Sequence, residues 1–137
     1  MANRSSSRAR SRVAVLPEVP APPRRSDTAG LYATLLSDLN STIIRMTSPR
    51  FDALLQRGSA EDRLQAMREI LGVEKARLVL GNAVLQDIAA KLKENEPALV
   101  EGRENLEEEL DRLESIARVL NTVSKFLDVI GKVVALV

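Results

Sequence analysis

The sequence has no cysteine, histidine or tryptophan among its 137 residues, and its aromatic residues are one Tyr and two Phe. Without thiols or imidazoles, the chain cannot form a disulfide, a Cys or His metal site, a cysteine nucleophile or a Ser-His-acid triad. The residues that remain supply no set of nucleophile, base and orienting group. We therefore predict a protein that is not an enzyme, binds no cofactor or metal and has no small-molecule substrate.

Charge is distributed unevenly along the chain, although the formal net charge is only +1. Residues 1–30 contain six arginines and two acidic residues, a net charge of +4, which leaves the other 107 residues with −3. The arginines are Arg4, Arg8, Arg10, Arg12, Arg24 and Arg25. This asymmetry predicts a basic N-terminal arm, residues 1–27, joined to a mildly acidic domain, residues 28–137.

The arm is rich in Ser and Arg and contains four of the six prolines, a composition typical of a disordered segment. Its arginines can bind the phosphates of nucleic acid without sequence specificity, or an anionic membrane surface, and such binding weakens with salt. The alternative is a solubilising terminus with no partner, since no aromatic residue lies in the first 30 residues to stack on a base. The arm lacks the apolar run of a secretory signal, but its composition also suits a transit peptide.

The rest of the chain has the pattern of an all-α protein. It contains only two prolines, Pro49 and Pro97, and no alternation of apolar and polar residues long enough for a strand. A first helix is expected over about 28–47, because its apolar residues recur at spacings of three and four. These residues are Leu31, Leu35, Leu36, Leu39, Ile43 and Met46. Ser48 as cap and Pro49 at the first helical position predict a short helical turn that Gly58 ends.

Two longer helices are expected to follow, over about 60–95 and 105–137. Ser59 followed by Asp62 is a capping pattern that starts the first of them. Its buried side is predicted to be a heptad-like track of Leu64, Met67, Leu71, Leu78, Leu85, Ile88 and Leu92. At 1.5 Å per residue the two segments span about 54 and 50 Å. Their equal lengths predict an antiparallel, coiled-coil-like hairpin, kinked at Gly72, with the first helix packed on it.

Two polar features are interpreted as structural features and not as functional sites. Residues 101–114 contain seven acidic residues and two arginines, and three of the acids, Glu104, Glu108 and Asp111, share one helical face. Acidic residues near a helix N-terminus complement the helix dipole, so we interpret this stretch as a solvated face that can also attract the arm or a basic partner. Tyr32, the only tyrosine, is predicted to pack with its hydroxyl in water.

The C-terminal segment is the candidate interface, because its apolar residues cover a wider arc than one neighbouring helix can bury. The predicted partner interface consists of Val119, Phe126, Val129, Val133, Leu136 and Val137. Lys125, Asp128 and Lys132 interrupt the segment, so it is not expected to span a membrane. The first helix, a second copy of the chain and a lipid surface are the three candidates to cover it.

The favoured hypothesis is a non-enzymatic helical interaction or assembly protein that self-associates, or docks a protein partner, through this C-terminal helix. One alternative is a helical subunit that binds an anionic membrane surface or forms a pore. A second alternative is a nucleic-acid accessory protein that binds through the arm. We expect a cytoplasmic location, since neither a secretory signal nor a transmembrane helix is recognised.

Overall fold

The computed structural model describes residues 23–136, with side chains from Thr28 onward, and within this range it contains helices and no strands. The helices are α2 (Pro23–Met46), α3 (Pro49–Gln56), α4 (Ala60–Gly81), α5 (Leu85–Glu94), α6 (Glu96–Arg112) and α7 (Ile116–Ile130). The prediction of an all-α fold is confirmed. Residues 1–22, which make up most of the predicted arm, lie outside the described range.

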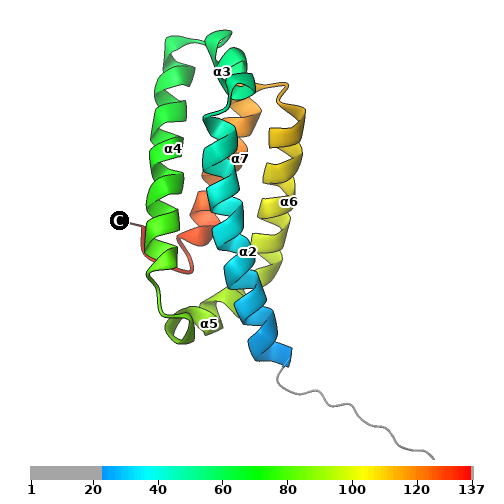
Figure 1. Cartoon of the computed structure of the whole chain (residues 1–137), viewed down its shortest axis with the longest axis vertical. Helices are drawn as coiled ribbons and strands as arrows, with labels where there is room; N and C mark the ends of the chain where they lie inside the picture. The colour runs from blue at the N-terminus through cyan, green and yellow to red at the C-terminus, as the bar shows by residue number, and fades with distance from the viewer. Residues whose placement is uncertain (1–22, 137) are drawn as a thin grey trace, which may run out of the picture.

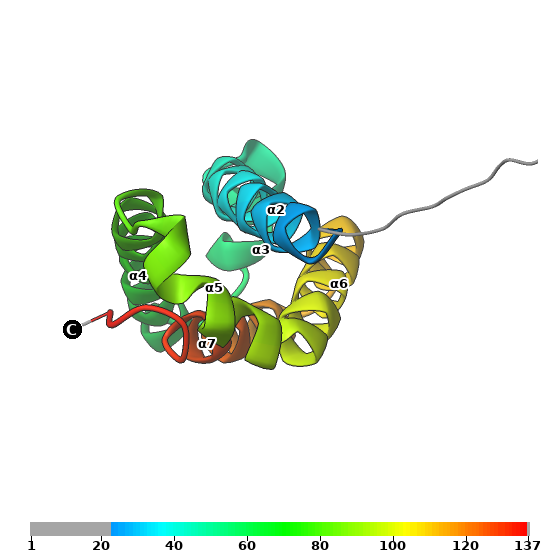
Figure 2. The same cartoon turned by 90° about the horizontal axis from the view of Figure 1, so that it is seen from below.

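Four long helices, α2, α4, α6 and α7, form the bundle and alternate in direction along the chain (Figure 1). The short helix α3 connects α2 to α4 at one end, and α5 connects α4 to α6 at the other. Seen along the bundle, α4 and α6 occupy opposite corners, and α2 and α7 occupy the other two (Figure 2). Helix α7 packs against both α4 and α6, and α2 packs against α4, α5 and α6.

The local signals at the start of the domain are confirmed. Leu35, Leu39 and Met46 on the predicted stripe of α2 are buried in the common core. Ser48 caps α3 by accepting a hydrogen bond from the backbone N–H of Phe51 at 3.2 Å. The capping box at α4 is also present, because Ser59 and Asp62 each accept a hydrogen bond from the other's backbone N–H at 3.0 Å. These motifs are predictable because both partners lie within four residues of each other.

The predicted continuous helix over 60–95 is not confirmed, because α4 ends at Gly81 and α5 begins at Leu85. The Tyr32 hydroxyl, on α2, donates to the Leu80 carbonyl at 2.8 Å, which also accepts from the Ala83 backbone N–H at 3.1 Å, and so ties the end of α4 to α2. The prediction that this hydroxyl stays in water is therefore wrong. Helix α4 also runs uninterrupted through Gly72, so the division lies ten residues beyond the predicted kink.

The predicted helix over 105–137 is also divided, so the long hairpin is not confirmed. Helix α6 ends at Arg112, Leu113 adopts a left-handed conformation with φ 46° and ψ 50°, and Ser115 caps α7. The connection expected between Asn95 and Asn105 does not exist, since α6 begins at Glu96 with a proline in its first turn. The result is a bundle of four shorter antiparallel helices in place of two long ones.

Tyr32→Phe removes the hydroxyl that bonds to the Leu80 carbonyl at the end of α4 and keeps the ring. Because the Leu80 carbonyl then loses its tertiary hydrogen bond, we expect the free energy of unfolding to fall by about 1 kcal/mol. Chemical denaturation followed by circular dichroism measures this change. Thr47→Ala is the control, since that exposed hydroxyl bonds only to carbonyls of its own helix end, and it should change stability by less than about 0.5 kcal/mol. Equal stability of Tyr32→Phe and the native chain would contradict the proposed role.

Candidate interaction surface

The predicted interface on the C-terminal helix is largely covered by the chain itself. Val119, Phe126 and Val133 are buried, while Val129 and Leu136 are half-buried and pack against the same core. Helix α7 ends at Ile130, and the residues after it turn back beside α4 (Figure 1), which buries Val133 and Val134. The expectation that this segment leaves a wide apolar surface uncovered is therefore wrong. Val137 lies outside the described residues.

The predicted arginine sites cannot be placed. Arg4, Arg8, Arg10 and Arg12 lie outside the described residues. Arg24 and Arg25 belong by their backbone to the first turn of α2, which starts five residues before the predicted beginning of the domain. Their role as an anion-binding arm stays a prediction.

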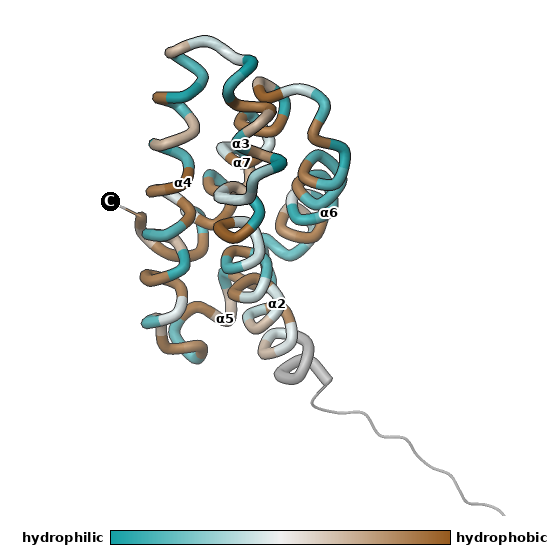
Figure 3. The backbone as a smooth tube through the Cα atoms, turned by 45° about the horizontal axis from the view of Figure 1, so that its top comes forward, coloured by the Kyte–Doolittle hydropathy of each residue, from teal (hydrophilic) through white to brown (hydrophobic). Residues whose placement is uncertain are grey.

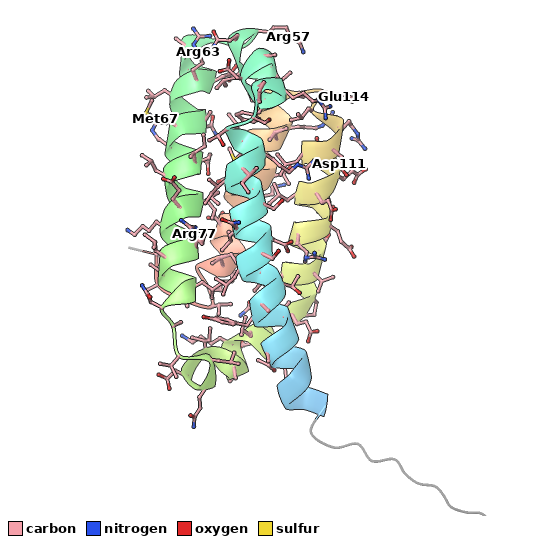
Figure 4. The ribbon with its side chains drawn as sticks, viewed as in Figure 1. Arg57, Arg63, Met67, Arg77, Asp111 and Glu114 are labelled. Carbon is pink, nitrogen blue, oxygen red and sulfur yellow. The ribbon has the colours of Figure 1, made fainter. Side chains whose placement is uncertain are left out.

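Large apolar side chains are exposed on α4 instead. Leu64, Met67, Leu71 and Leu78 are each between 50% and 60% exposed. We call these four residues the α4 stripe, because their spacings of three, four and seven place them on one side of the helix. In Figure 4 Met67 points away from the bundle, and in Figure 3 apolar segments recur along the whole of α4. The sequence pattern predicted these same residues as the buried side of the helix, so that prediction is wrong.

The opposite face of α4 explains the inversion, because it carries smaller residues that permit close packing. Ala66, Val73 and Ala76 are buried there, together with Leu80. A Cβ atom at Gly72 would lie 2.9 Å from Cδ1 of Leu127, so a larger residue there would require the Leu127 side chain to move. Gly72 thus serves the contact between α4 and α7 and does not act as the predicted break.

The margins of the α4 stripe are mainly basic. Arg63, Arg68, Lys75 and Arg77 are exposed on α4, against the exposed Glu61 and the half-buried Glu74. None of these six residues forms an ion pair with any residue that the structure describes. No ion pair within the described part of the chain therefore holds these side chains in place. The stripe is an apolar surface bordered by a net charge of two positive units.

A groove of about 450 Å³ lies between α6 and α7 on another side of the bundle. Its lining is mixed: Ala98, Gly102 and Val129 are apolar, Asn105 and Thr122 are polar, and Phe126 is buried beneath them. Gly102 lets Phe126 pack closely against α6 at this place, since a Cβ atom on Gly102 would lie 3.0 Å from Cδ1 of Phe126. We call this feature the α6–α7 groove.

The rim of the α6–α7 groove is mainly acidic, with Glu101, Glu108 and Glu109 on α6 and Lys125 on α7. Glu108 forms an ion pair with Arg112, and Glu109 pairs with Arg112 and Arg118. Glu101 is exposed and has no ion-pair partner among the described residues. This carboxylate is therefore the rim charge most available to a basic group from another molecule.

Two ion pairs join the acidic helix α6 to α2. The Nε and Nη2 atoms of Arg103 donate to the two carboxylate oxygens of Asp38. This bidentate hydrogen bonding raises the pKa of the guanidinium. Arg45 pairs with Asp111 near the upper end of α6, where Figure 4 labels Asp111. These pairs fix α6 against α2, and leave its outer acids in water, as the interpretation of a solvated face expects.

The chain matches no known protein family, and neither a curated protein nor a solved structure is significantly similar to it. Among the described residues, no group of three or more acidic side chains is placed to hold a metal ion. Within the same part of the chain, no helix has the length and apolar content needed to cross a membrane. The α4 stripe and the α6–α7 groove are therefore the features on which a function can be argued.

Packing of α4 in the bundle changes the pKa of the Glu69 carboxyl group. Burial raises its pKa, and the nearby charge of Asp128 adds to the rise, while a hydrogen bond from Gln65 and the charge of Arg68 partly oppose it. The charged form is thus less favourable in the folded chain than in the unfolded chain. Its contribution to stability is present at low pH and is lost as pH rises through the pKa of the folded state.

Glu69→Gln should therefore raise the midpoint of thermal unfolding at pH 7, because the amide carries no charge to desolvate. The difference from the native chain should vanish at pH values where Glu69 is protonated. Thermal denaturation at several pH values between 3 and about 7 measures both effects. Glu101→Gln, at an exposed acid, is the control. A variant that is less stable than the native chain at pH 7 would contradict the assignment.

Proposed function

We propose that the protein is a non-enzymatic helical assembly protein that self-associates through the α4 stripe. The observation that carries the proposal is the row of four large apolar side chains left at least half exposed on one face of a well-packed bundle. Soluble monomers rarely expose contiguous apolar surface of this kind, and such patches usually mark interaction sites. The function is the one favoured from the sequence, with α4 in place of the C-terminal helix.

Covering the stripe provides enough free energy to support association. Full burial of one Leu or Met side chain contributes about 1.5–3 kcal/mol, so covering four half-exposed ones contributes roughly 3–6 kcal/mol. Ordering and loss of translational freedom offset part of this gain. We therefore expect reversible self-association that depends on protein concentration, not a permanent dimer.

A second copy of the chain fits the charges of the stripe better than an anionic lipid surface does. The basic margins would be attracted to either one. A lipid surface, however, would also approach Glu61 and Glu74 on the same helix, and residues 31–137 carry a net charge of −3. Another copy has acidic side chains on α6 that can pair with the basic margins. A protein contact can also leave Glu61 and Glu74 exposed to water.

Leu71→Glu together with Leu78→Glu tests the proposal, since both substitutions place a charge in the stripe without touching the core. We expect the mass of the native chain, measured by light scattering, to rise with concentration from the 15.0 kDa monomer. The double variant should stay monomeric, with an unchanged circular dichroism spectrum. Ile44→Glu is the matched control, because Ile44 is 61% exposed on α2 and lies outside the stripe.

Two results would contradict self-association through α4. One is a native chain that stays monomeric up to millimolar concentration, and the other is a double variant that associates as the native chain does. Flotation with vesicles that contain anionic lipid distinguishes the membrane alternative: a monomeric native chain that floats, with a double variant that does not, would replace the proposal by lipid binding. Nucleic-acid binding through the arm stays a separate prediction, to be tested by its loss on removing residues 1–26 and by its dependence on salt.

A further inference from the structure

We infer that the α4 stripes of two copies pack against each other in antiparallel orientation, which makes a closed dimer with two-fold symmetry. This inference rests on the proposed self-association and specifies the partner helix, its direction and its register. It is carried by the order of the charges along the two margins of the stripe. Both margins have a positive net charge, but the order of the signs lets each margin pair with its own equivalent.

Each margin of the stripe changes sign along its length. By their helical spacing, one margin carries Glu61, Arg68 and Lys75, and the other carries Arg63, Glu74 and Arg77. The first margin runs from acid to base, and the second begins with a base and has its acid towards the C-terminal end. A two-fold axis perpendicular to two antiparallel helices places each margin against the same margin of the other copy, in reverse order. Acidic and basic residues of one margin then come together.

The apolar residues set the register of the pair. In this register Met67 of each copy packs on Leu71 of the other copy at the centre of the contact. Leu78 then reaches Ala60, which is exposed at the start of the partner helix, and Leu64 packs along the same face. All four members of the α4 stripe are therefore covered, on the side of α4 that faces away from its own buried residues.

The same register pairs the charges on both margins. Lys75 lies within two residues of the position opposite Glu61 of the partner copy, and Glu74 lies within one residue of the position opposite Arg63. Each contact occurs twice by symmetry, so four opposite-charge pairs form. The one like-charge contact is between the two copies of Arg68, beside the axis. The two acids that a lipid surface would repel thus become binding partners, which fixes direction and register.

Other arrangements match the stripe less well. A parallel dimer places Glu74 beside Glu74 of the partner copy within the stripe, and brings Arg63 close to Arg68. Shifting the antiparallel pair by one heptad places Glu74 against Leu71 in one direction and shortens the apolar overlap in the other. The outer face of α6 also carries acids, but beyond Ala98 all its exposed residues are polar or charged. That face gives the leucines of the stripe no apolar surface to pack on.

The inference is tested with two variants of opposite charge. The acidic variant is Arg63→Glu with Lys75→Glu, and the basic variant is Glu61→Lys with Glu74→Lys. Each variant alone brings like charges together at all four pairs, so its self-association should be at least about 10-fold weaker than that of the native chain. Mixed in equal amounts, the variants restore all four pairs and should form a particle of twice the monomer mass. Light scattering measures both results.

A chain that carries all four substitutions should dimerise like the native chain, because every pair then has its signs exchanged. This chain also controls for the fold, since Arg63→Glu removes a hydrogen bond from Arg63 to the Gly58 carbonyl. Two further controls make the same changes of net charge at exposed residues away from α4, and each should dimerise like the native chain. They are Lys93→Glu with Lys125→Glu, and Glu104→Lys with Glu107→Lys.

Cross-linking tests the direction of the helices. The chain has no cysteine, so one introduced thiol reports only its distance from the same thiol of the other copy. Arg68→Cys places the two thiols beside the axis, where a short bismaleimide should link them. Lys75→Cys, one heptad further along the same margin, separates them by about 18 Å along the helices and should not be linked. Both variants are compared at concentrations at which light scattering shows association.

Acidic and basic variants that each associate like the native chain would overturn the inference and leave self-association through the α4 stripe standing. A mixture no heavier than its components, equal linking of the two Cys variants, or growth of the native chain beyond a dimer would also overturn it. A native chain that is itself monomeric would overturn the proposed function and the inference together.

Discussion

Helix α4 can bury only one of its two apolar faces, and the rest of the structure depends on which one. The face of small residues, around Gly72 and Ala76, is the buried one, because it lets the backbone of α4 approach α2 and α7 closely. The face of large residues stays in water as a consequence. A bundle with the leucines inside would need more space between α4 and its neighbours, and would lose the close contact between Gly72 and Leu127.

The same constraint accounts for the coverage of α7. This helix is apolar over a wide arc, and it obtains neighbours on several sides because α4 and α6 both pack along it and the residues after Ile130 fold back. The apolar residues of the C-terminal segment, which were predicted to be uncovered, are thus covered within the bundle. Large apolar side chains remain exposed instead on α4, the helix next to α7 in the bundle (Figure 2). The sequence predicted exposed apolar surface, but on the C-terminal helix and not on α4.

Sequence reasoning was reliable where the interactions are local. The helix class, the stripe of α2, and the caps at Ser48 and Ser59 depend on residues within a few positions of each other, and all of them are present. The choice between the faces of α4 depends on interhelical distance, which periodicity does not contain. Heptad spacing of leucines has the same pattern whether it faces a core or a partner, so the track was recognised and assigned to the wrong side.

The divisions of the two long segments depend on tertiary contacts in the same way. Helix α4 ends where a hydroxyl from α2, 48 residues earlier in the chain, bonds to the Leu80 carbonyl. Helix α6 ends at Leu113, a residue with no sequence preference for the left-handed conformation that it adopts. For the candidate site, the sequence supplied every residue of the stripe but not its exposure. The groove was missed, although Gly102 in an acidic helix was a signal of close approach by another element.

The most direct test of the account is the rate at which Met67 is oxidised by peroxide, at low and high protein concentration. Met67 is 59% exposed on the stripe, whereas Met46 is 2% exposed in the core and serves as an internal reference. If a second copy covers α4, the oxidation of Met67 should be fast in dilute solution and slow well above the association concentration, while Met46 reacts slowly throughout. Oxidation of Met67 at one rate over the whole concentration range would contradict the claim that another copy of this chain covers the helix.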